Sequence, residues 1–134
     1  MISIPSENKR FTLFNEKVLL YKSNENFDFY DVLVVTCRDI ENINIPSSVK
    51  HISSHAFSHC RKLKTVTFES NSQLKIIDKF AFFLSSIKSI SLPSSVTQIC
   101  ENAFSECYDL ESIEIPLDSQ LNFIGDYSFS YSSI

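Results

Sequence analysis

Two stretches of this sequence decide its fold: residues 45–68 read IPSSVKHISSHAFSHCRKLKTVTF, and residues 93–115 read PSSVTQICENAFSECYDLESIEI. When the proline of one is placed on that of the other, the apolar positions coincide without a gap. The matched pairs are Val49 and Val96, Ile52 and Ile99, Ala56 and Ala103, Phe57 and Phe104, Cys60 and Cys107, Leu63 and Leu110, Val66 and Ile113, and Phe68 and Ile115. Eight coincidences at fixed spacing indicate an internal repeat.

The repeat continues between and after these two stretches. Residues 69–92, ESNSQLKIIDKFAFFLSSIKSISL, keep the pattern with a longer loop in front and one residue fewer inside, and a fourth copy begins at residue 121. One column holds Phe57, Phe82, Phe104 and Phe129, spaced 25, 22 and 25 residues apart. Insertions of this kind belong in loops between stacked units, so the phenylalanines are expected to form an interior ladder.

Each unit contains two kinds of segment. The segments LKTVTF, IKSISL and LESIEI alternate apolar and polar residues, which predicts short strands with one buried face. The middle, x-x-A-F-x-x-C, spaces its apolar residues three or four apart, which predicts a single helical or 3₁₀ turn. A unit of this length buries its apolar face only against neighbours, so the pattern predicts an α/β repeat solenoid with a parallel sheet.

The first 44 residues are predicted to form a variant repeat with an inserted β-hairpin. Residues 11–22 and 30–36 are rich in Val, Leu, Phe and Tyr, and Asn15 to Lys17 suit a hairpin turn. Residues 45–134 are then about four repeats, the last incomplete. Because residues 2–5, ISIP, resemble the end of a strand, we expect the chain to start and stop inside a unit, either as a fragment of a longer array or with ends that contact neighbouring subunits.

Composition excludes several function classes. The 134 residues are 43% hydrophobic with a net charge of −4, which suits one soluble domain and disfavours nucleic acid as a partner. No signal peptide or apolar stretch of roughly 18 residues is present, so we expect no membrane insertion and, for the chain as written, a cytoplasmic location. A single glycine excludes phosphate-cradling loops, and no cofactor is expected.

Candidate metal and catalytic residues are few. His51, His55 and His59 are four apart, a spacing that would align them on a helix for zinc, but the other units have no ligands at equivalent positions. The neighbouring His59 and Cys60 point in different directions and lack an orienting carboxylate, so we expect Cys60 to pack as an anchor, and the four cysteines to be buried and free. We predict no metal site, no catalytic residues and no enzymatic activity.

The repeats resemble the BspA-like leucine-rich repeat family, whose units have the form I-P-x-x-V-x-x-I-x-x-x-A-F-x-x-C-x-x-L-x-x-I-x-I. The resemblance covers residues 40–134, with Ser85 in place of Cys and Ser128 in place of Ala. It implies a right-handed solenoid with the sheet on its concave face and the turns on its convex side. Family members are mostly described as surface antigens that bind host proteins or other cells.

Two functions are therefore expected, both involving a protein partner. The first is a non-enzymatic protein-interaction module of the adhesion or surface-antigen type, for which the resemblance implies the cell surface. The alternative is an intracellular structural component of a large assembly, such as a cytoskeletal complex.

The candidate binding surface is the polar side of the predicted concave sheet, because residues that alternate with buried anchors point outward. It comprises Glu41, Asn42, Asn44, Lys64, Thr65, Thr67, Lys88, Ser89, Ser91, Glu111, Ser112 and Glu114. These columns contain no Trp, Tyr or Arg, the residue types that dominate binding hot spots. The alternative interpretation is a solvated sheet face on which Glu and Lys offset one another.

Overall fold

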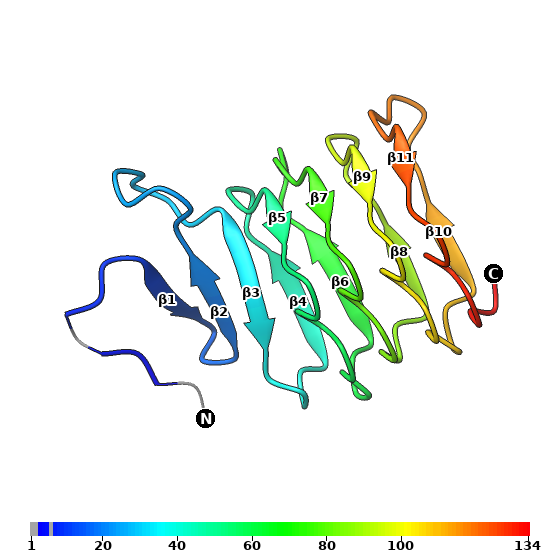
Figure 1. Cartoon of the computed structure of the whole chain (residues 1–134), viewed down its shortest axis with the longest axis horizontal. Helices are drawn as coiled ribbons and strands as arrows, with labels where there is room; N and C mark the ends of the chain where they lie inside the picture. Colours follow the sequence, from blue (N-terminus) through cyan, green and yellow to red (C-terminus); the bar gives the residue numbers. More distant parts are fainter. Residues whose placement is uncertain (1–2, 6) are drawn as a thin grey trace.

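The chain forms a β-solenoid of about four turns with an antiparallel hairpin at one end (Figure 1). The computed structural model describes residues 3–5 and 7–134. The strands are β1 (Phe11–Phe14), β2 (Val18–Tyr21), β3 (Val32–Thr36), β4 (Asn42–Ile45), β5 (His51–Ile52), β6 (Thr65–Phe68), β7 (Ile76–Ile77), β8 (Ser89–Ser91), β9 (Gln98–Ile99), β10 (Ser112–Glu114) and β11 (Phe123–Ile124). The two termini lie at opposite ends of the coil.

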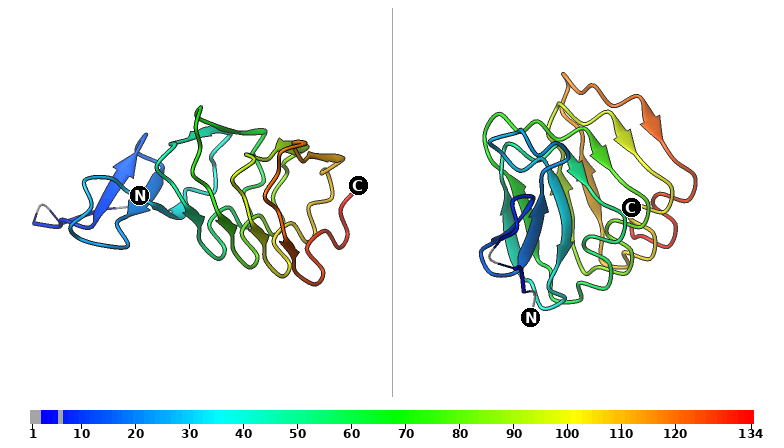
Figure 2. Two further views of the ribbon diagram at one scale, coloured as in Figure 1. Left: turned by 90° about the horizontal axis from the view of Figure 1, so that it is seen from above. Right: turned by 60° about the vertical axis from the view of Figure 1, so that its left-hand side comes forward.

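Each turn of the solenoid contributes strands to two stacks, which lie on different sides of the coil (Figure 2). One stack contains β4 paired with β6 and β8 paired with β10, all parallel. The other continues from the hairpin in the order β1-β2-β3-β5-β7-β9-β11. The first stack corresponds to the alternating segments of the sequence. In the second stack, β1, β2 and β3 fall in the predicted N-terminal strands, whereas the two-residue strands β5, β7, β9 and β11 were not predicted.

The interior is the predicted ladder of aromatic rings. Phe57 and Phe82 stack with ring centroids 4.7 Å apart, Phe82 and Phe104 at 4.9 Å, and Phe104 and Phe129 at 5.5 Å, all close to parallel. The other anchors of the repeat, including Cys60 and Cys107, are buried around them. Stacking neighbouring units has therefore removed these apolar faces from water, which is the main stabilising contribution in such a fold.

The prediction of a helical or 3₁₀ turn in the x-x-A-F-x-x-C segment is wrong, because the described part of the chain contains no helix. His55 and His59 both have positive φ, at 62° and 61°, and the same two positions of the later turns repeat this. Left-handed residues interrupt a right-handed helix. The segment instead alternates local turns, such as Ser58 N–H to His55 O, with bonds to the next unit, such as Phe57 N–H to Ala81 O at 2.7 Å. The fold class is therefore all-β and not α/β.

The N-terminal segment forms the expected hairpin. β1 and β2 pair antiparallel through a three-residue loop, Asn15 to Lys17. Asn15 and Glu16 have φ of 51° and 60°, as the two central residues of a type I′ turn require, and Lys17 N–H donates to Phe14 O. β3 then pairs antiparallel with β2 and parallel with β5, which joins the hairpin to the coil. The strand expected at residues 2–5 is not seen at residues 3–5, and residue 2 lies outside the described part of the chain.

Candidate binding surface

All twelve residues of the candidate surface are exposed, and they lie on β4, β6, β8 and β10 or directly before these strands. The strands place them there because the alternate residues, such as Ile43, Val66 and Ile90, are buried in the core. Parallel pairing in register aligns Asn42 with Thr65. The twelve side chains therefore form columns that run along the solenoid axis.

Neighbouring members of these columns hydrogen-bond to one another. Lys64 Nζ lies 2.7 Å from a carboxylate oxygen of Glu41, and Thr65 Oγ1 donates to Asn42 Oδ1 at 2.7 Å. The hydrogen bond from Lys64, helped by its charge, holds the pKa of Glu41 below its usual value. Such exposed pairs contribute little to the stability of the fold.

A groove divides this surface between β6 and β8, where the described strands are not paired. Its volume is about 530 Å³, and its rim carries Thr67 and Ser91. The chain leaves β6 through residues 69–75, a loop two residues longer than the one between β4 and β5. Val66, Ile90 and Leu92 contribute apolar atoms to the groove. The groove thus lies among exposed polar side chains, with the buried Val66, Ile90 and Leu92 beneath it.

The second strand stack carries a polar column that sequence reasoning missed. His51 Nε2 lies 2.8 Å from an Asp78 carboxylate oxygen, and Lys75 Nζ donates to Gln120 Oε1 at 3.3 Å. The available signal was the V-x-x-I and L-x-x-I spacing that precedes each A-F segment. This spacing predicts core anchors but no strands, since strands of two residues leave no alternating pattern to detect.

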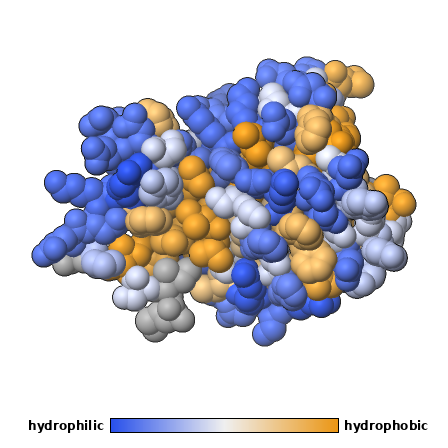
Figure 3. Space-filling view, in the orientation of Figure 1, coloured by the Kyte–Doolittle hydropathy of each residue, from blue (hydrophilic) through white to orange (hydrophobic). Residues whose placement is uncertain are grey.

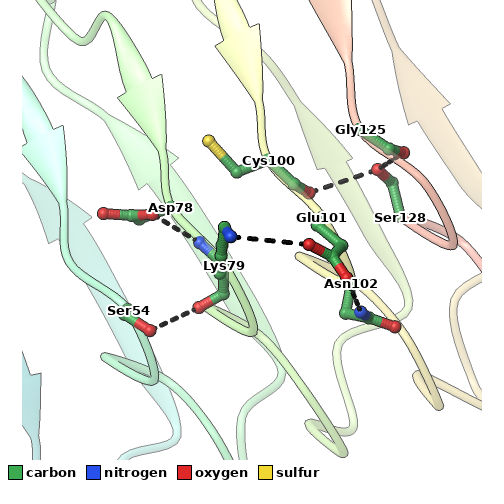
Figure 4. Close-up of polar contacts among 8 residues, drawn as sticks. All are labelled: Ser54, Asp78, Lys79, Cys100, Glu101, Asn102, Gly125 and Ser128. Carbon is green, nitrogen blue, oxygen red and sulfur yellow. Dashed lines mark hydrogen bonds and ion pairs between the residues drawn. The ribbon is translucent and has the colours of Figure 1, made fainter.

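Where the second stack meets the A-F turns, hydrogen bonds and an ion pair join successive turns of the solenoid (Figure 4). Ser54 Oγ donates to Lys79 O at 2.8 Å, and Lys79 Nζ lies 3.5 Å from Glu101. Ser128, which departs from the repeat pattern, uses its hydroxyl to bond Cys100 O at 3.2 Å. Beside it, a Cβ on Gly125 would lie 2.5 Å from Glu101 N, which explains the glycine. These contacts fasten one turn to the next and converge on no common point.

The three histidines point to different neighbours. His51 bonds to Asp78, His55 stacks on Phe80 with ring centroids 5.1 Å apart, and His59 bonds to Ser58 through Nδ1 at 2.8 Å. In the part of the chain that the structure describes, no group of three or more metal-ligating side chains comes together. The left-handed backbone at His55 and His59 is the physical reason that a helical His spacing does not apply here.

The four cysteines differ in how deeply they are buried. Cys60 and Cys107 are buried as expected, and burial raises the pKa of both thiols above the usual value. Cys37 and Cys100 are only half buried, so the expectation of burial is wrong for these two. All four are free thiols.

No helix among residues 3–5 and 7–134 has the length and hydrophobicity to cross a membrane.

Comparison with known proteins matches residues 30–134 to the sequence profile of the BspA type leucine-rich repeat region, in six copies. No curated protein matches the chain significantly.

Three solved structures resemble the chain. The pneumococcal vaccine antigen PcpA is 34% identical, with a TM-score of 0.66 over 69% of this chain and 22% of that one. A leucine-rich cell surface protein of Faecalibacterium prausnitzii is 17% identical, with a TM-score of 0.47 over 99% and 55% of the two chains. A leucine-rich repeat protein of Bacteroides ovatus is 17% identical, with a TM-score of 0.39 over 91% and 57%. The chain therefore spans about a fifth of PcpA and a little over half of the other two.

Proposed function

We propose that this chain, which belongs to the BspA-type leucine-rich repeat family, is a non-enzymatic protein-interaction module. The observation that carries the proposal is the groove between β6 and β8, set in a face of exposed polar columns. Hydroxyl side chains there bond mainly to exposed polar side chains of the same face, so they exchange partners at little cost. We propose that the partner lies across the twelve-residue surface and inserts into the groove.

The test places charge at the groove. Thr67→Glu with Ser91→Glu adds two carboxylates to its rim, which is expected to weaken binding of the native partner about tenfold or more, since unpaired charge at an interface is costly. The partner is first identified by crosslinking to the intact protein, and the affinity is then measured by titration.

The matched control is Gln98→Glu with Asn122→Glu, which adds the same charge beside the second stack, where both residues are exposed. Binding is expected to persist in this control. If the groove variant stays folded and binds as well as the control, the proposed surface is wrong.

We also propose that the module is displayed at the cell surface. Support comes from its likeness to PcpA, which is a vaccine antigen. An antibody against the folded chain is expected to label intact cells, and labelling only after permeabilisation would contradict this location.

A structural role in a large assembly is the second candidate, and the last turn of the solenoid favours it. Its exposed side chains are unusually apolar: Ile115, Leu117, Phe123, Ile124 and Ile134 are each at least 48% exposed. The outer edges of β10 and β11 also carry no strand among the described residues. We propose that this end contacts a neighbouring subunit.

End-to-end contact is tested by measuring mass against concentration. The intact chain is expected to associate as concentration rises, because association buries the apolar side chains. Phe123→Ser with Ile124→Ser removes two of them and is expected to keep the chain monomeric, whereas Thr67→Ser, on the other side of the coil, serves as the control. A chain that stays monomeric at millimolar concentration would argue against this role.

A further inference from the structure

Three aromatic residues occupy a backbone conformation that disfavours them. Phe80, Tyr127 and Tyr131 have φ of 57°, 58° and 59°, in the left-handed region where Gly and Asn are favoured. Asn102, which precedes the alanine of the A-F pair as Phe80 does, shows that asparagine fits the same position, at φ 56°. A bulky residue at such a site adds strain to the fold.

The two tyrosines gain little from burial in return. Tyr127 is 69% exposed and Tyr131 is 75% exposed. The left-handed backbone at these positions recurs in every A-F turn and belongs to the fold, but burial does not explain why aromatic rings stand there. Strained residues that persist without stabilising the fold cluster at functional sites.

These rings form one wall of a groove on the outside of the A-F turns. Its volume is about 600 Å³, and Phe80 and Phe83, in edge-to-face contact at 5.5 Å, form the opposite wall. The lining residues between the walls are polar: Asn102, Ser105, Glu106 and Ser130. Figure 3 shows that hydrophobic patches are interspersed with hydrophilic residues on one face of the molecule.

The groove is negatively charged at its floor. No Lys or Arg lines it, and among the described residues Glu106 makes no ion pair. One Glu106 oxygen, Oε2, accepts a hydrogen bond from Tyr108 Oη at 2.8 Å, which orients the carboxylate. Aromatic faces and a carboxylate without a countercharge both attract cations.

The spacing of the walls suits a single cationic group. Phe80 and Tyr127 belong to turns on either side of the Asn102 turn, and successive strands of a sheet lie about 4.8 Å apart. A cation midway between the walls would lie about 5 Å from each ring, within the roughly 6 Å over which cation–π attraction acts. The chain uses the same contact elsewhere, where Arg10 Cζ lies 4.9 Å from the Tyr21 ring centroid.

We propose that this groove binds an Arg or Lys side chain of a protein partner, held between the aromatic walls above Glu106. The site is separate from the polar columns on β4 to β10. Failure of one does not imply failure of the other.

The test uses the intact, isotope-labelled chain and a short acetylated peptide of alternating serine and arginine. Titration is expected to shift the NMR signals of Tyr127, Tyr131 and Glu106. The same peptide with citrulline, which has the shape of arginine without its charge, is expected to shift none. Shifts of equal size with citrulline, no shifts with either peptide, or shifts produced instead by a neutral oligosaccharide such as chitotriose would each overturn the proposal.

Two variants separate binding from stability. Tyr127→Asn with Tyr131→Asn removes one wall and relieves the left-handed strain, so it is expected to raise Tm by about 2–5 °C and to weaken arginine-peptide binding about 2–5-fold for each ring lost. Glu106→Gln is expected to weaken binding of the charged peptide and to leave the fold intact.

The matched controls are Leu117→Asn, which removes a fully exposed apolar side chain outside the groove, and Glu25→Gln, which removes an exposed carboxylate outside both the groove and the polar columns. Both are expected to bind as the unaltered chain does. A folded tyrosine variant that keeps the affinity of the controls would show that the walls do not bind the cation.

Discussion

Phe104 shows at the scale of one residue how the repeat is stabilised. Its ring is fully buried between those of Phe82 and Phe129. Phe104→Ala leaves a cavity that stacked turns fill poorly, and the free energy of unfolding is expected to fall by about 3–5 kcal/mol. Chemical denaturation measures this. A loss below about 1 kcal/mol would contradict the interior ladder, and Leu117→Ala, at a fully exposed position, is the control.

Tyr108 gives a prediction about pH. Its hydroxyl donates to Glu106, and this hydrogen bond is the main cause that raises the pKa of the Tyr108 phenol above its usual 10.0. Because the folded pKa is raised, the contribution to stability is complete below pH 10 and is lost as pH rises through the folded pKa. Glu106→Gln is expected to lower this pKa towards the usual value, as followed by NMR titration of the labelled ring. An unchanged titration would show that the hydrogen bond does not form.

The A-F turns are the element that distinguishes this fold from an α/β solenoid. His59 is exposed and has φ of 61°. In that conformation His59→Gly is expected to leave the protein about 1 kcal/mol more stable than His59→Ala, since a Cβ is disfavoured there. A helical turn would give the opposite order by a similar amount. Comparing the two variants by denaturation cancels the loss of the imidazole. The sign of the difference in their unfolding free energies therefore decides between the left-handed and the helical backbone.

The whole molecule behaves as a linear array of repeats, because each strand of the coil pairs with strands of adjacent turns. The hairpin covers one end of the long sheet, whereas β11 has a free outer edge in the described structure. Amide exchange is therefore expected to be slowest near Phe82 N–H, which donates to Ala103 O, and faster at Gly125 N–H, which donates to Ile99 O. Uniform protection along the chain would indicate a single cooperative unit.

The sequence predicted those features that depend on spacing within one unit. The Phe column, the anchors around it, the strands β4, β6, β8 and β10, and the hairpin at Asn15 and Glu16 all follow from apolar periodicity and turn residues. The same alternation placed all twelve candidate residues on an exposed face. Their role in binding, and the division at residue 44, stay predictions.

Only the tertiary structure decided the features that arise between units. Four features depend on residues of other turns: the left-handed backbone at His55 and His59, the second strand stack, the break between β6 and β8, and the aromatic groove. A spacing of three or four apolar residues suits a helix within a single unit. Here the donors of Phe57 and His59 pair with the next turn instead, because stacking offers each N–H an acceptor that an isolated unit lacks.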